Sequence, residues 1–279
     1  MLKLLKSGLF STLQDLGRFG YRNKGVPVSG VMDAETVTKL NRLLDNPINA
    51  LVMEITMTGP TAVFEEDTFF VIGGAEMQIT LNNKPIANYT IYQVRKGDVL
   101  SYGRLENGFR SYLAVKGGFY AETVLGSSAM YFPITKNGCL KENDEISYEK
   151  HSIFEPKILG LKIASFLNET ELYVYRGPEF NMLDDRQLEQ LFSKDFTVAK
   201  ENNRMAYQLS EVIKGHKASI LTSATLPGTV QFTPSGKLII LMKDGQTTGG
   251  YPRILQLSDK AIAVLAQKKY GDAISFKLL

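Results

Sequence analysis

Residues 244–251 combine several hydrogen-bonding side chains with small residues over a short stretch. Two adjacent hydroxyls and one carboxamide stand beside a Gly-Gly pair, directly after an apolar run at residues 237–242. Glycine lets a backbone approach a ligand closely, and ligand contacts concentrate on loops held by rigid strands. The stretch therefore predicts a binding site for one small polar ligand, with a polar hairpin loop as the alternative. Its candidate ligand contacts are Gln246, Thr247, Thr248, Gly249, Gly250 and Tyr251.

A second group of candidate residues lies near the N-terminus. Arg18 follows Gly17 and precedes Phe19-Gly20, so its guanidinium is expected beside irregular, closely approaching backbone. Arginine is suited to bidentate recognition of a carboxylate. Arg18 is therefore a candidate clamp for a substrate carboxylate, and Gln14 is a second candidate contact. The alternative for Arg18 is a structural role, in which it bonds loop carbonyls or pairs with Asp15.

Asp33 has two interpretations. It precedes a helical pattern over residues 34–44, where an aspartate typically caps the helix N-terminus. A capping carboxylate is ionised and only accepts hydrogen bonds, so it is a poor proton donor. The other interpretation is a catalytic or ligand-positioning residue.

The elements that must position these residues are mainly β-strands. Short runs rich in Val, Ile, Phe, Tyr and Thr are separated by Gly, Asn, Asp and Pro, and Asn82-Asn83 predicts a hairpin turn. Besides the helix after Asp33, one is expected after Asp184 or Asp185 and one after Ser258. We predict a mainly β chain with a few short helices.

A weak internal repeat suggests two related halves. Residues 59–64 and 96–102 resemble residues 227–232 and 270–276, with a strand between the members of each pair. We therefore predict one unit spanning residues 1–279, built from duplicated halves of about 1–155 and 156–279.

Composition excludes several classes of function. The net charge is only +3, and no stripe of basic residues with interleaved aromatics indicates nucleic-acid binding. The chain has no G-x-x-x-x-G-K-[ST] motif for ATP. With one cysteine and two histidines, no disulfide is possible within the chain and no metal site is expected. The first residues lack the pattern of a signal peptide, and no apolar run reaches the roughly 18 residues of a membrane helix, so we expect a cytoplasmic protein.

Two motifs near opposite ends of the chain resemble a known family. Residues 244–252 are similar to the D-x-Q-T-T-G-G-Y-P signature of the allophanate hydrolase subunit 2 family. Residues 12–20 and 25–33 resemble its T-x-Q-D-x-G-R-x-G and G-V-P-x-S-G-x-M-D pair. The resemblance covers essentially the whole chain and implies two cyclophilin-like β-barrel lobes.

The resemblance adds Asp244 and Arg204 to the candidate substrate contacts. Arg204-Met205 is similar to the family's R-M-G segment, although Ala206 replaces the usual glycine and Gln208 stands where arginine is common. Residues 126–128 also depart from the family's G-S-R-S-T. These changes bear on which ligand is bound.

Family members include the C subunit of 5-oxoprolinase, which implies partner subunits A and B and an ATP-dependent conversion of 5-oxoproline to glutamate. Opening a lactam requires activation of its carbonyl. Tyr251 is then a candidate donor to the developing oxyanion, with Thr248 and Asp33 as further catalytic candidates. We expect residues 246–251 to form one wall of a cleft that the B subunit completes, across from the Arg18 loop. No cofactor is expected on this chain alone, and ATP is used by the complex.

The same resemblance implies two alternative functions. One is a regulatory protein of the KipA kind, which binds and neutralises an inhibitor of a sensor kinase. The other is a subunit of a biotin-dependent carboxyltransferase, as in urea carboxylase.

Overall fold

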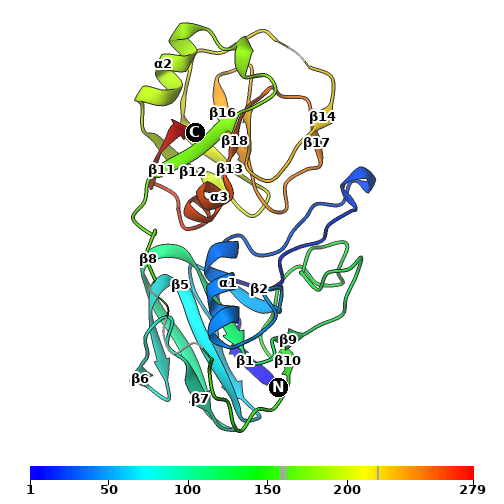
Figure 1. Cartoon of the computed structure of the whole chain (residues 1–279), viewed down its shortest axis with the longest axis vertical. Helices are drawn as coiled ribbons and strands as arrows, with labels where there is room; N and C mark the ends of the chain where they lie inside the picture. Colours follow the sequence, from blue (N-terminus) through cyan, green and yellow to red (C-terminus); the bar gives the residue numbers. More distant parts are fainter. Residues whose placement is uncertain (158–160, 162, 219) are drawn as a thin grey trace. The chain divides into compact units, whose positions relative to one another are not determined.

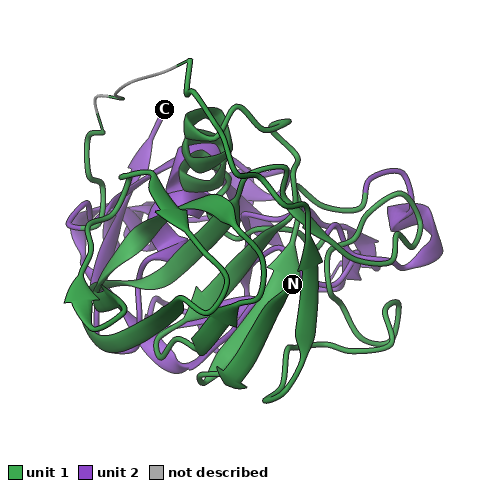
Figure 2. Cartoon of the chain, turned by 90° about the horizontal axis from the view of Figure 1, so that it is seen from below, with its two compact units in different colours: residues 1–18, 29–167 green, residues 19–28, 168–279 purple. Residues whose placement is uncertain are grey.

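The computed structural model describes residues 1–157, 161, 163–218 and 220–279, and it divides into two compact units. Unit 1 comprises residues 1–18 and 29–167, and unit 2 comprises residues 19–28 and 168–279 (Figure 2). The halves predicted from the sequence met near residue 155, whereas the units divide after residue 167. Residues 19–28, which we call the arm, join unit 2. The origin of the two units by duplication stays a prediction.

Unit 1 is built on one ten-stranded sheet in which two long antiparallel strands, β5 and β8, pair along most of their length. The path through the sheet is β2-β3-β8-β4-β1-β10-β9, and β5 also pairs with β6 and β7. The strands are β1 (Leu2–Lys6), β2 (Phe10–Gln14), β3 (Val52–Thr56), β4 (Thr61–Phe64), β5 (Thr68–Leu81), β6 (Lys84–Pro85), β7 (Tyr92–Val94), β8 (Val99–Val115), β9 (Phe119–Tyr120) and β10 (Glu145–Tyr148).

Successive side chains of a strand point to opposite faces, and both faces are buried where residues 70–74 of β5 pair with residues 111–115 of β8. Phe70 and Leu113 lie in the larger core cluster of unit 1. Val71 and Ala114, their neighbours in sequence, lie in a second cluster with Leu40 of helix α1 (Ala34–Leu43). This two-sided burial explains the short apolar runs at residues 69–72 of β5 and 112–115 of β8.

Unit 2 is a closed barrel in the order β11-β18-β15-β16-β13-β12-β19, with a separate two-stranded ribbon of β14 and β17 (Figure 1). Helices α2 and α3 pack on barrel strands, α2 on β19 and α3 on β11 and β18. The bounds are β11 (Glu171–Arg176), α2 (Asp185–Ser193), β12 (Phe196–Asn202), β13 (Ala206–Val212), β14 (Ser223–Ala224), β15 (Thr229–Phe232), β16 (Lys237–Leu241), β17 (Thr248–Gly249), β18 (Arg253–Leu257), α3 (Asp259–Ala266) and β19 (Ala273–Leu278). The prediction of a mainly β chain with two barrel-type sheets and a few short helices is confirmed.

The helices begin at the residues that the sequence predicted. Asp33 accepts a hydrogen bond from the Thr36 N–H, and Ser258 accepts one from Ala261. Asp184, rather than Asp185, caps α2 through a capping box. No helix in the described part of the chain is long and apolar enough to span a membrane.

Candidate functional site

The loop of residues 244–251 lies in unit 2 between barrel strands β16 and β18, and the buried residue Thr225 forms two hydrogen bonds with its backbone. The Thr225 N–H donates to the Thr247 carbonyl at 3.0 Å, and its hydroxyl donates to the Gln246 carbonyl. Thr248 and Gly249 then pair with β14 as strand β17. Because the fastening uses backbone carbonyls, the side chains of Gln246, Thr248 and Tyr251 remain exposed.

Arg204 and Asp244, both predicted as substrate contacts, bind each other. The guanidinium Nε lies 2.8 Å from Asp244 Oδ2, and Nη2 lies 3.0 Å from Oδ1. Both side chains are buried, and the Asp244 N–H also donates to the Arg204 carbonyl. The pair anchors the start of the loop. A contact of either residue with a ligand stays a prediction.

Two side-chain amides pack closely against Gly249. A Cβ placed on Gly249 would lie 2.3 Å from Gln231 Nε2 and 2.9 Å from Gln246 Nε2. Contacts this short do not occur, so any larger residue would displace these side chains. Gly250 has no such restriction, since a Cβ there would come no closer than 3.8 Å to the Ile220 carbonyl oxygen.

The arm contributes a charged residue that the sequence analysis missed. Arg22, in the short helix η1 (Arg22–Lys24), donates from its guanidinium to the Thr225 carbonyl, and burial lowers its pKa. Arg22 stands four residues after Arg18 in the same motif region, and only its contact with a residue 203 positions away identifies it.

Arg253 closes the other end of the loop. It holds Glu179 through Nε at 2.9 Å and Nη2 at 2.7 Å, and it donates from Nη1 to the Ala224 carbonyl at 2.6 Å. The hydrogen bond from Arg253 lowers the pKa of Glu179, so this carboxylate is ionised at neutral pH. This ion pair joins β18, β14 and the turn before the short helix η2 (Phe180–Met182).

In unit 1, Gln14 and Arg18 hold the loop of residues 124–130. Arg18 is fully buried and donates to the carbonyls of Val124 and Ala129 at 3.0 and 2.9 Å. Gln14 Nε2 donates to the Met130 carbonyl at 3.1 Å. Arg18 therefore makes the loop-carbonyl contacts that were the structural alternative. A role as a carboxylate clamp stays a prediction.

Asp15 completes this scaffold. Its carboxylate accepts hydrogen bonds from the Ser127 hydroxyl at 2.7 Å, the Ser128 N–H at 2.8 Å and the Gly17 N–H at 2.8 Å. A hollow of about 290 Å³ lies beside the same loop, lined by Asp15, Ser127 and Ser128 among others.

Asp33 is fully buried and caps α1, with Oδ1 accepting from the Thr36 N–H at 2.9 Å and Oδ2 from its hydroxyl at 2.7 Å. Its own N–H donates to the Tyr112 hydroxyl at 3.0 Å. Burial and the nearby Glu54 and Asp33 raise the pKa of Tyr112, which therefore stays protonated. Glu54 in turn lies 3.9 Å from Arg110, and both are buried. The capping role is confirmed, and a catalytic role stays a prediction.

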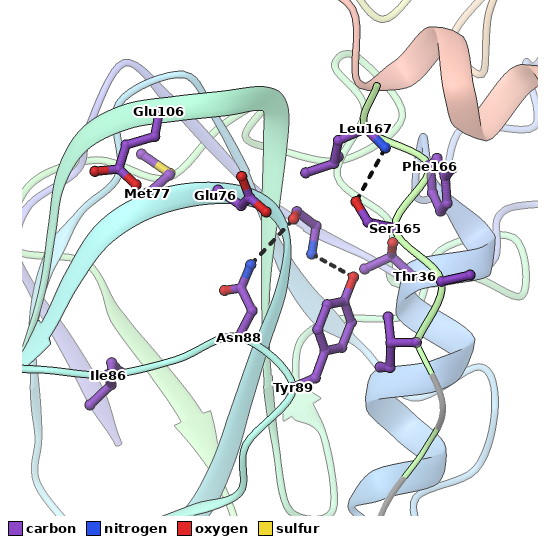
Figure 3. Close-up of a pocket in the computed structure, with 13 residues that line it drawn as sticks. Thr36, Glu76, Met77, Ile86, Asn88, Tyr89, Glu106, Ser165, Phe166 and Leu167 are labelled. Atoms are coloured by element: carbon purple, nitrogen blue, oxygen red, sulfur yellow. Dashed lines mark hydrogen bonds between the residues drawn. The ribbon is translucent and has the colours of Figure 1, made fainter. Parts of the chain in front are cut away.

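A hollow of about 410 Å³ in unit 1 involves none of the predicted site residues (Figure 3). Asn88 and Tyr89 point toward β5 there, where Asn88 donates to the Gly74 carbonyl and the Tyr89 hydroxyl accepts from the Gly74 N–H. The predicted residues thus form one group around the 244–251 loop in unit 2 and another in unit 1. Their predicted placement across one crevice stays a prediction. Within the described ranges, no group of three or more His, Cys, Asp or Glu side chains is placed to hold a metal ion.

The chain is similar in sequence and in fold to known proteins. The chain is 32% identical to the C subunit of 5-oxoprolinase from Escherichia coli K12, over 99% of this chain and 90% of that protein. The crystal structure of TTHA0988 matches with a TM-score of 0.89 and 26% identity, covering 99% of this chain and 55% of that one. The crystal structure of Kluyveromyces lactis urea amidolyase matches with the same score and identity, covering 100% of this chain but 18% of that one.

The chain therefore spans about half the length of the TTHA0988 chain and less than a fifth of the urea amidolyase. The model of the family described as "Carboxyltransferase domain, subdomain A and B" matches residues 24–278. This chain belongs to the carboxyltransferase-domain family.

Proposed function

We propose that this chain is the C subunit of an ATP-dependent 5-oxoprolinase, which acts with subunits A and B to convert 5-oxoproline to glutamate. The observation that carries this proposal is the identity of 32% with the C subunit of the Escherichia coli 5-oxoprolinase, along nearly the full length of both chains. The exposed polar loop at residues 244–251 supports it, because it offers hydroxyl and amide groups to a small polar ligand.

The chemistry divides the loop into two roles. Ring opening places negative charge on the lactam carbonyl oxygen, and a positioned hydrogen-bond donor stabilises that charge. The Tyr251 hydroxyl is the proposed donor, since its side chain is 42% exposed. Thr247 and Thr248 hold the substrate. Arg18 and Asp33 act by fixing the loop and helix that they bond, and not by transferring protons.

In this proposal, the site also includes a surface of a partner protein. Three large apolar side chains in or next to the 244–251 loop are exposed, Met205 at 50%, Leu226 at 55% and Tyr251 at 42%. Exposed apolar groups around a polar loop are typical of a surface that a partner covers. The sequence has no phosphate-binding glycine loop, so ATP binds to one of the partners.

The test is reconstitution from purified subunits. We expect glutamate to form from 5-oxoproline and ATP only when this chain is mixed with subunits A and B. Replacing Tyr251 by Phe and Thr248 by Val together should lower kcat/KM by at least about tenfold, since each change removes one hydrogen-bonding hydroxyl. Unchanged activity in this double variant would remove the loop from the mechanism.

A second candidate is transfer of a carboxyl group from carboxybiotin, which the match to a carboxyltransferase-domain model favours. The distinguishing assay is carboxylation of urea or 5-oxoproline by free carboxybiotin, followed as formation of biotin and of the carboxylated acceptor. Turnover in this assay without ATP would favour the carboxyltransferase over the oxoprolinase.

A further inference from the structure

Gln231 carries a buried carboxamide to which the proposed mechanism gives no role. It lies on β15, is 1% exposed, and stands between Val230 and Phe232, which are fully buried. Successive strand residues point to opposite faces, so Gln231 and its two neighbours occupy different sides of the barrel wall.

The carboxamide of Gln231 supports the 244–251 loop from beneath. Its Nε2 lies where a Cβ on Gly249 would approach to 2.3 Å, so the amide packs directly on that glycine. Its Oε1 accepts a hydrogen bond of 3.5 Å from Gln246 Nε2. A buried amide is thus linked to an exposed one at the loop surface.

A neighbouring glutamine shows what a purely structural amide does. Gln256 on β18 donates from Nε2 to the Pro227 carbonyl at 2.7 Å and accepts from the Thr229 hydroxyl at 2.9 Å. In contrast, Gln231 Nε2 is buried and has no hydrogen-bond acceptor among the described residues. A buried donor without an acceptor destabilises a fold, and an apolar side chain of the same length would avoid this penalty. The barrel alone therefore gives no reason for glutamine at position 231.

We propose that Gln231 is a positioning residue: it orients the Gln246 carboxamide so that the amide's second N–H and its carbonyl oxygen bind a lactam. This inference rests on the proposed function. A five-membered lactam holds its amide in the cis form, which places the ring N–H and C=O on one edge. A primary carboxamide has a donor and an acceptor on one edge as well. The two edges therefore form two parallel hydrogen bonds, which ring-opened glutamate cannot form.

The test compares substitutions by methionine, which matches glutamine in length but lacks its polar atoms. The assay is ATP-dependent glutamate formation by the complex with subunits A and B. The competitor is 5-oxotetrahydrofuran-2-carboxylate, a lactone in which oxygen replaces the ring N–H. Wild type should bind the lactam about three- to tenfold more tightly than the lactone, because the lactone lacks the donor.

Gln231→Met should raise KM for 5-oxoproline about three- to tenfold, remove the preference over the lactone, and leave kcat within about twofold. Its melting temperature should be unchanged or higher. Gln246→Met should behave alike in KM, and the double variant should be no worse than Gln246→Met, because the two residues act in series. The matched control Gln256→Met should lower the melting temperature and leave KM unchanged.

An unchanged KM and lactone preference in Gln231→Met, or additive effects in the double variant, would overturn the inference. A fall in melting temperature without a kinetic effect would also overturn it, since it would make Gln231 a structural residue like Gln256. If the wild-type complex does not turn over 5-oxoproline, the proposed function itself fails. NMR of the Gln246 side-chain amide then tests independently whether Gln231 orients it. Unshifted Gln246 amide resonances in Gln231→Met would refute that role.

Discussion

Substitution of Asp244 by Ala tests whether the Arg204–Asp244 pair holds the loop or serves a ligand. Arg204 is 6% exposed and binds both carboxylate oxygens, at 2.8 and 3.0 Å. Asp244→Ala removes one partner of a buried ion pair, a change that destabilises a protein by about 3–5 kcal/mol. A change of 1 kcal/mol shifts the melting temperature of domains in this size range by about 2–8 °C. We therefore expect a loss of at least about 6 °C.

Thermal unfolding followed by circular dichroism measures this shift, and two further variants serve as controls. Glu169→Ala removes a partner of Lys260 at 3.0 Å in an exposed pair, which should change the melting temperature little. Replacing Arg204 by Met and Asp244 by Leu together removes both buried charges. This double variant should recover most of the stability lost in Asp244→Ala.

A different result would refute the reasoning. If Asp244→Ala melts within about 2 °C of wild type while KM rises, the pair contributes little to stability. Both residues would then serve the ligand, as the sequence predicted, and the loop would take its shape from its other contacts, which include those of Thr225 and the β14–β17 ribbon.

Three other predictions concern single residues. Gly249→Ala should cost about 1–3 kcal/mol in thermal melts, because its Cβ would overlap the Gln231 amide, whereas Gly250→Ala should be neutral. Asp15→Ala should speed amide hydrogen exchange at Gly17 and Ser128, because their N–H groups lose the carboxylate that accepts from them. Burial raises the pKa of Tyr148 to about 12. The protonated hydroxyl therefore contributes its full stability to unit 1 below about pH 10, and this contribution is lost as the pH rises from about 10 to 12. Urea unfolding of wild type and Tyr148→Phe at pH 9 and 11.5 should show that the variant lacks this loss.

Features encoded by neighbouring residues could be predicted from the sequence. Asp33 and Ser258 cap helices because their side chains bond an N–H three residues on. Asn82 and Asn83 both have positive φ, at 51° and 63°, in the turn between β5 and β6. Asparagine tolerates this conformation, so the hairpin follows from residue type alone.

The repeated segments of the sequence have the same turn structure but differ in how their strands pair. Asp98 and Asp272 each follow a glycine of positive φ and accept from the N–H three residues earlier. The matching segments 59–64 and 227–232 differ in their partners: β4 pairs with β8, which follows Asp98, while β15 pairs with β16 and β18 instead of β19. Strand pairing depends on the whole sheet, and a short sequence resemblance does not determine it.

The contacts of the site residues could not be predicted from the sequence, because their partners are distant along the chain. Asp244 finds Arg204 forty positions earlier, and the arm reaches Thr225 through Arg22. Residue types showed that these groups could bind carboxylates or carbonyls. They did not show whether the carboxylate belonged to a ligand or to the protein itself.

The two motifs contain both buried and exposed candidate residues, and substitutions in these two groups must be interpreted differently. The side chains of Arg18 and Asp244 are buried and form hydrogen bonds with other groups of the protein. The side chains of Thr248 and Tyr251 are exposed on the loop. Loss of activity after substitution of a buried member therefore reports ligand binding only when the melting temperature is unchanged. For the exposed members, a loss of activity at constant stability is the expected result, because their side chains can act only on what the loop faces.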